Sequence, residues 1–180
     1  RYLQFKFIGM EPTNDRGPEM AFMAIVGKAV HTTVQRLMLK HPRVSAIERL
    51  MEDPVTRVRG SNDLQILDHD DVMAVLDIKS GVKLPDVPKA DHLIQLAWYC
   101  YLSGHARAVV QYILRSNGAK RRFTRSWAEL REQWELTRDL ARNITDMTIE
   151  GRIAPKTPAN RSDCADCPLR DACDKVEYGE

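Results

Sequence analysis

Two aspartates and a lysine are spaced so that they could act together on a metal ion. Asp77 and Lys79 lie two residues apart in an apolar segment with strand periodicity, so both side chains leave the same face. Asp63 lies on the polar face of the preceding predicted strand. Converging carboxylates repel each other unless a cation is present, and Mg²⁺ binds one or two carboxylates together with water and phosphate oxygens. The pattern predicts a divalent-metal site; an ordinary Asp–Lys ion pair at a strand end is the alternative.

A second candidate metal site lies in the last part of the chain, where Cys164, Cys167 and Cys173 crowd together. A disulfide between the first two would close a very tight ring, and the sequence begins without a secretory signal, so the cluster indicates metal ligation in a reducing compartment. A tetrahedral zinc site or an iron–sulfur cubane needs four ligands. Cys100 is a candidate for the fourth, although its apolar neighbours are typical of a buried free thiol.

The elements that must position these residues follow from apolar periodicity. Helices are expected over 18–39, 90–102 and 126–147, the last opened by a capping box of Ser126 and Glu129. Strands are expected over 56–67, 72–79, 106–114 and 120–125, with His69 in the first hairpin turn and Asn117-Gly118 in the second. Along 56–67 we expect Val58, Leu64 and Ile66 on one face and Arg57, Arg59, Asp63 and Gln65 on the other. This order predicts a single α/β domain over residues 1–180, a small mixed sheet flanked by helices with a cysteine-cluster tail at 155–180.

Further polar residues accompany the carboxylates: His31 on the first helix, and Gln95 and Tyr99 on one face of the second. Taken in chain order, the motifs are Gly27-x3-His31, Gly60-x2-Asp63, Asp77-x-Lys79 and Gln95-x3-Tyr99. They resemble the RecB-type branch of the PD-(D/E)XK nucleases. The motif Cys164-x2-Cys167-Pro168-x4-Cys173 resembles the iron–sulfur subgroup of that branch, which includes the AddB nuclease domain and CRISPR-associated exonucleases. The resemblance spans residues 1 to about 175.

This resemblance implies a restriction-endonuclease-like fold and a divalent-metal-dependent DNA exonuclease that acts on single strands or DNA ends in recombination, repair or processing. It implies that Mg²⁺ or Mn²⁺ is bound by His31, Asp63, Asp77 and the backbone carbonyl of Ile78. It also implies that Lys79 orients or activates the attacking water, and that Gln95 and Tyr99 position the DNA strand and support the site.

The resemblance further implies a 4Fe–4S cluster on the three tail cysteines, with structural zinc as the alternative. The family pattern has a fourth cysteine near the N-terminus, in a context like Cys-Pro-x-Arg-Tyr. Because this sequence opens with Arg1-Tyr2, we expect that cysteine shortly before Arg1. The cluster would connect the tail to the N-terminal segment.

The formal net charge of +2 identifies no partner, but basic residues outnumber acidic ones between 107 and 142. The expected DNA-binding residues surround Phe123 and are Lys120, Arg121, Arg122 and Arg125. Cations mixed with an aromatic residue are typical of a single-strand groove, although charges also protect the exposed edge of a hairpin. The tryptophans at 98, 127 and 134 are expected in the core. No pattern indicates base readout, so we expect little sequence specificity.

Several classes of protein are excluded or left open by these observations. No apolar run is long enough to span a membrane, and we expect a cytoplasmic protein. The alternatives to a nuclease are a non-catalytic nuclease-fold module that binds DNA and a zinc-stabilised nucleic-acid-binding protein. A helicase or recombination partner and an oligomeric assembly are compatible with each of them.

Overall fold

The computed structural model of the chain describes residues 18–152, with side chains from Phe22 onward. The tail cysteines and the N-terminal segment lie outside this range. Helices occupy α2 (Pro18–Met38), α3 (Ala90–Ser103) and α4 (Trp127–Ile149). Strands occupy β1 (Val44–Glu52), β2 (Arg59–Leu67), β3 (Met73–Gly81), β4 (Arg107–Leu114) and β5 (Lys120–Ser126). Residues 25–142 form one compact unit, and the remaining described residues belong to a second.

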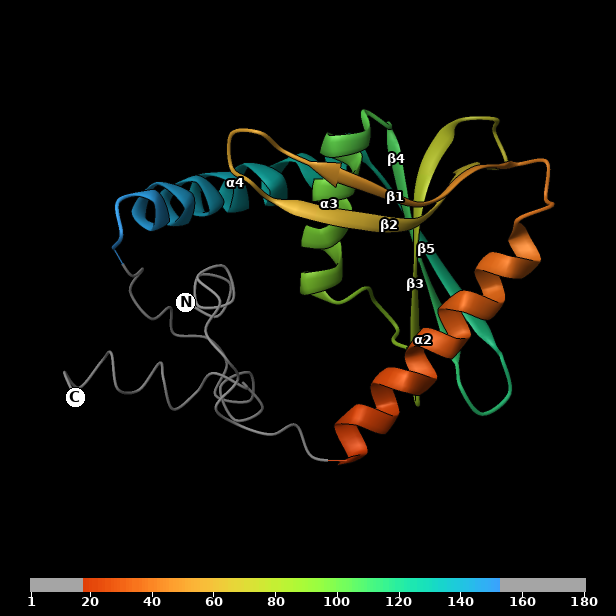
Figure 1. Cartoon of the computed structure of the whole chain (residues 1–180). Coiled ribbons are helices and arrows are strands. Elements are labelled where there is room, and N and C mark those ends of the chain that lie inside the picture. Colours follow the sequence, from red (N-terminus) through yellow and green to blue (C-terminus); the bar gives the residue numbers. More distant parts are fainter. Residues whose placement is uncertain (1–17, 153–180) are drawn as a thin grey trace. The chain divides into compact units, whose positions relative to one another are not determined.

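The five strands form one sheet in the order β1-β2-β3-β4-β5 (Figure 1). Only β3 and β4 are parallel, while the other neighbouring strands are antiparallel. Parallel neighbours need a crossover, and α3 supplies it between β3 and β4. The predicted mixed sheet flanked by helices is confirmed.

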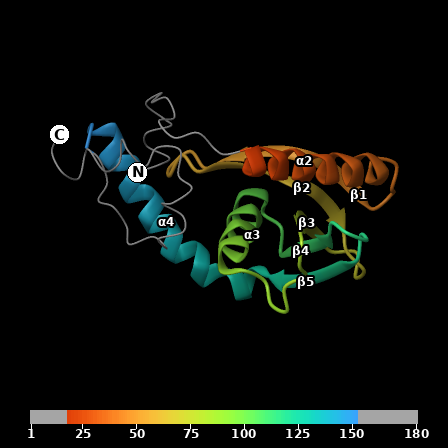
Figure 2. The same cartoon turned by 90° about the horizontal axis from the view of Figure 1, so that it is seen from below.

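Helices cover the two faces of this sheet within residues 25–142 (Figure 2). On one face, Val30 and Val34 of α2 pack against a cluster that includes Leu64, Leu76 and Ile78. On the other face, α3 and the start of α4 pack onto strand residues of β3 and β4. The predicted core position of the tryptophans is confirmed: those at 98 and 134 are buried, and the one at 127 packs against the same cluster.

Strand β1 and the start of β2 differ from the expectation. No element was expected at β1, which is an edge strand with a register shift between Val44 and Ala46. The strand expected from residue 56 begins at Arg59, because residues 56–58 belong to the connection between β1 and β2. Val58 packs against the α3-side cluster rather than with Leu64 and Ile66. Gln65, expected on a polar face, is buried.

The predicted ends of the helices are confirmed. The Ser126 backbone N–H donates to Glu129 Oε2 over 2.7 Å, and the Glu129 N–H donates to Ser126 Oγ over 3.3 Å, which is a capping box. Gly104 ends α3 in the left-handed conformation with a φ of 69°, a conformation that glycine adopts without a steric penalty. Within residues 18–152, no helix combines the length and the apolar character needed to cross a membrane.

Candidate active site

The candidate site lies where β2 and β3 stop pairing with each other. Their ladder joins Leu64–Leu67 to Met73–Leu76, but β3 continues to Gly81 and β2 begins earlier, at Arg59. Past the ladder, the Asp63 side chain takes the place of a strand partner. Its Oδ2 accepts a hydrogen bond from the Ile78 backbone N–H at 2.6 Å. A carboxylate is thereby held against β3 one residue away from Asp77.

Helix α2 brings His31 to the same carboxylate. His31 Nδ1 lies 3.0 Å from Asp63 Oδ1, and both side chains are partly buried. The hydrogen bond to Asp63 raises the pKa of His31 and outweighs the opposing effect of burial; the charge of Asp77 raises it further, while that of Lys79 lowers it. The sequence placed these residues 32 positions apart, and the fold brings them into contact.

On β3, Asp77 and Lys79 form an ion pair on the face covered by α3. Lys79 Nζ lies 2.9 Å from Asp77 Oδ2. Asp77 is only 4% exposed. Burial raises its pKa above the ordinary value and is the largest effect; Lys79 opposes it and the charge of Asp63 adds to it. On balance the pKa of Asp77 is raised, because burial outweighs the stabilisation of its charged form by Lys79.

A chain of hydrogen bonds holds Lys79 to the neighbouring helix and strand. Lys79 Nζ donates to Gln95 Oε1 over 2.7 Å, and Gln95 Nε2 donates to Tyr99 Oη over 2.6 Å. Tyr99 Oη donates to the Ser61 carbonyl of β2 over 2.7 Å. In the structure, therefore, Gln95 and Tyr99 link Lys79 to β2.

The donors gathered here fit a hard divalent cation. They are one imidazole, two carboxylates and the carbonyl of the residue between Asp77 and Lys79, and oxygen-rich sets with an imidazole suit Mg²⁺ and Mn²⁺. The ligand atoms of His31, Asp63 and Asp77 do not form a group within 4.8 Å of one another; among the residues with described side chains, Asp68, His69 and Asp70 do. The carboxylates of Asp63 and Asp77 carry like charges, which repel each other.

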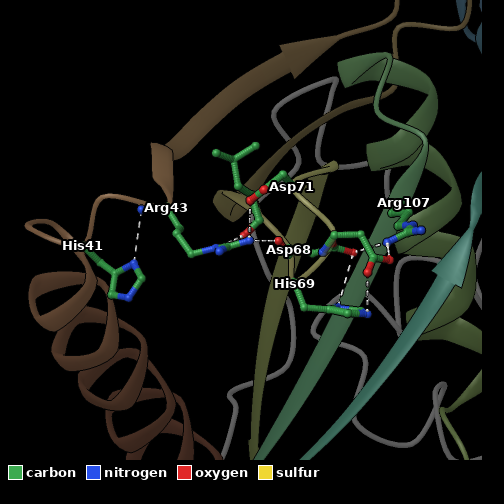
Figure 3. Close-up of polar contacts among 8 residues, drawn as sticks. His41, Arg43, Asp68, His69, Asp71 and Arg107 are labelled. Atoms are coloured by element: carbon green, nitrogen blue, oxygen red, sulfur yellow. Dashed lines mark hydrogen bonds and ion pairs between the residues drawn. The ribbon is translucent and has the colours of Figure 1, made fainter.

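The group at Asp68–Asp70 occupies the β2–β3 turn, as predicted for His69 (Figure 3). Arg107 Nη1 lies 2.7 Å from Asp68 Oδ2 and 2.7 Å from Asp70 Oδ2, so an arginine already neutralises these carboxylates. Arg43 approaches the turn from the other side and bonds to the Asp68 carbonyl and to Asp71 (Figure 3). A metal at this group would have to displace Arg107.

The predicted DNA-binding cations lie on β5, an edge strand, and alternate between its two faces. Arg121 donates to the Pro85 carbonyl over 2.8 Å and to Asp86 Oδ1 over 2.6 Å. Arg122 donates to buried Gln111 over 2.8 Å. Arg125 donates to the Thr124 carbonyl over 2.9 Å. Three of the four cations thus have partners within the protein, and the four do not share one surface.

The cysteine predictions divide into two groups. Cys100 is buried and free among apolar side chains, and burial raises the pKa of its thiol to about 12, as expected for an unreactive thiol. Cys164, Cys167 and Cys173 lie outside the described residues.

Two main-chain groups of the site, the Ile78 N–H and the Ser61 carbonyl, were not expected from the sequence. Every residue has a carbonyl, and every residue except proline has an N–H, so no residue type marks them. Gly60 gave an indirect signal: a Cβ there would lie 3.3 Å from Tyr99 Cε1. A glycine in a strand is typical of such a close approach.

Comparison with known proteins places this geometry in a family. No curated protein gives a significant match. One similar solved structure is described as the crystal structure of SSO0001, with a TM-score of 0.58, 19% identity, and coverage of 87% of this chain and 71% of that chain. A phage related exonuclease from Haemophilus somnus 129PT gives a TM-score of 0.47 and 14% identity over 82% of this chain and 79% of its own. The model of the PD-(D/E)XK nuclease superfamily matches residues 19–174. The chain therefore belongs to the PD-(D/E)XK nuclease superfamily.

Proposed function

We propose that this protein is a divalent-metal-dependent deoxyribonuclease. It acts as an exonuclease on single-stranded DNA or DNA ends during recombination, repair or processing, in the cytoplasm. The observation that carries the proposal is the convergence of His31, Asp63, Asp77 and Lys79 at the point where β2 and β3 part. Membership of the nuclease superfamily supports the same reaction class.

In this proposal the side chains His31, Asp63 and Asp77 and the carbonyl of Ile78 hold Mg²⁺ or Mn²⁺. A bound divalent ion lowers the pKa of its water and polarises a phosphoryl oxygen. Asp63 is oriented for this task because one carboxylate oxygen accepts from the Ile78 N–H and the other contacts His31. Lys79 projects its ammonium group beside Asp77, where it donates to the attacking water or to the phosphate oxygen that gains charge.

Cleavage of end-labelled single- and double-stranded DNA in Mg²⁺, Mn²⁺ or EDTA tests the proposal. We expect metal-dependent release of label that Asp77→Asn abolishes, because the substitution removes a charge from the metal site and keeps its shape. Asp70→Asn is the matched control: it makes the same change in the turn group, and we expect full activity. Loss of activity in Asp70→Asn with retention in Asp77→Asn would place the metal at the turn. Binding without cleavage by the parent protein would favour a non-catalytic DNA-binding module.

We also propose that Cys164, Cys167 and Cys173 hold a 4Fe–4S cluster, with zinc as the alternative, and that residues 1–180 function as one nuclease domain. The spacing of the cysteines supports this, and the superfamily match extends past all three. We expect iron and acid-labile sulfide in the purified protein. Each of the three single Cys→Ser variants should lose both the iron and the sulfide. Zinc without sulfide would identify the alternative. A helicase or recombination partner is proposed on the resemblance alone.

A further inference from the structure

The loop that follows the lysine of the proposed site presents two apolar side chains to solvent. This β3–α3 loop, residues 82–89, joins the end of β3 to the start of α3 (Figure 1). Val82 is 77% exposed and Val87 is 71% exposed. Val82 follows Lys79 by three residues, a separation of about 10 Å in an extended chain. Val82 therefore lies within about 10 Å of Lys79 along the chain.

The β3–α3 loop is fixed to the rest of the sheet at several points. At its start, the Arg115 backbone N–H donates to the Gly81 carbonyl over 2.9 Å. In its middle, Leu84 packs against the α3-side core, and Arg121 bonds to Pro85 and Asp86. At its end, a tyrosine of β4 accepts from the Lys89 N–H over 3.2 Å. The valines are consequently exposed on an anchored loop.

The charge around these valines is positive. Lys83 and Lys89 are both exposed. Asp86, the one acidic residue of the loop, is paired with Arg121. Exposed cations next to exposed apolar groups complement a nucleic acid strand, since the cations neutralise phosphates and the apolar groups contact base faces. The base faces of a duplex are covered by stacking, so a single strand fits this surface better.

We propose that the β3–α3 loop binds the single-stranded DNA on which the site acts. Val82 and Val87 contact unstacked bases, and Lys83 and Lys89 neutralise neighbouring phosphates. Arg121 then holds the loop in place. The inference rests on the proposed function and specifies its substrate as a strand with unstacked bases.

Equilibrium binding of a fluorescein-labelled single-stranded oligonucleotide to the Asp77→Asn protein tests the loop. Combining Val82→Ser with Val87→Ser should weaken binding about tenfold without changing its salt dependence, because apolar contacts between valines and bases release no counterions. Combining Lys83→Ala with Lys89→Ala should reduce the slope of log K against log salt by about 0.7 for each phosphate that is no longer neutralised. Leu136→Ser on α4, where the side chain is 70% exposed, is the matched control and should bind like its parent.

An abasic oligonucleotide of equal length separates base contacts from other effects. The valine substitutions should not weaken binding of the abasic strand, because the groups that they contact are missing from it. Unchanged binding of the intact strand by the valine variant would overturn the inference, as would equal losses on both strands. If the parent protein cleaves DNA while either of these results holds, the proposed function stands and only the loop assignment fails. If the parent protein neither cleaves nor binds DNA, the proposed function fails, and the loop assignment with it.

Discussion

The Ser61 carbonyl determines which group donates in each hydrogen bond of the chain that runs through Tyr99 and Gln95 to Lys79. The Ser61 carbonyl can only accept, so Tyr99 must donate to it and must accept from Gln95 Nε2. The amide oxygen of Gln95 therefore faces Lys79, which donates to it. Tyr99, acting through Gln95, thus determines how the lysine is held.

Replacing Tyr99 by phenylalanine tests this role at the scale of one residue. Without the hydroxyl, Gln95 loses its acceptor and is free to rotate its amide, which would turn a donor toward Lys79. We expect kcat to fall about 10- to 100-fold, the usual effect of removing a group that orients a ligand of the site. KM for DNA should be unchanged. A rise in KM with kcat preserved would instead indicate that Tyr99 contacts DNA. Tyr101→Phe, on the same helix, is the control and should behave as wild type.

At the scale of elements, the β2–β3 turn is a clamp in the sense that its residues bond to arginines at the starts of β4 and β1. Arg107 begins β4 and Arg43 precedes β1, and both bond to the turn residues 68–71. Burial raises the pKa of Asp68, but hydrogen bonds from Arg107 and from the Asp70 N–H, with the charges of Arg107 and His69, outweigh it. The net pKa is below the ordinary value, so the folded protein favours the ionised carboxylate.

This lowered pKa gives the clamp a defined pH dependence. Its contribution to folding is complete above the ordinary pKa of an aspartate, about 4, and is lost as the pH falls from there toward the lowered pKa. Asp68→Asn should therefore unfold at lower urea concentration than wild type at pH 7, and the difference should narrow below about pH 4. Asp139→Asn, an exposed aspartate of α4, should change the midpoint little at either pH. If the difference in urea midpoint between Asp68→Asn and wild type stayed constant with pH, the charge of Asp68 would not be the source of the stabilisation.

At the scale of the whole molecule, the sequence predicted those elements whose side chains follow a simple period. Helix α3 and strands β3 and β4 are buried on one or both faces, so burial imposes a regular apolar pattern on them. Strand β1 is mostly exposed, contains a register shift, and holds Glu48 at a φ of 48°. These irregularities remove the alternation of apolar and polar residues by which a strand is identified. The composition of β1 did not indicate a strand either.

The same distinction applies to the candidate site. Asp63, Asp77 and Lys79 were expected at one site from their type and spacing, and His31, Gln95 and Tyr99 from the resemblance to a nuclease family; the structure brings these side chains together. Their connections through the backbone of Ile78 and Ser61 depend on where two strands part, and this is a property of the ladder as a whole. The bond between Arg121 and Asp86 of the β3–α3 loop was not expected from the sequence either, because it joins residues 35 positions apart.

Because the β2–β3 ladder ends early, the backbone amide of Ile78 can report on the position of the Asp63 side chain. At Ile78 the amide proton is held by a carboxylate side chain rather than by a neighbouring strand. Its exchange with deuterium, followed by NMR, therefore depends on one removable group. In Asp63→Ala this amide should exchange much faster, while the Val75 amide, within the paired part of β3, keeps its rate. Any event that draws Asp63 away from β3 will then be visible at a single backbone proton, in protein that performs no catalysis at all.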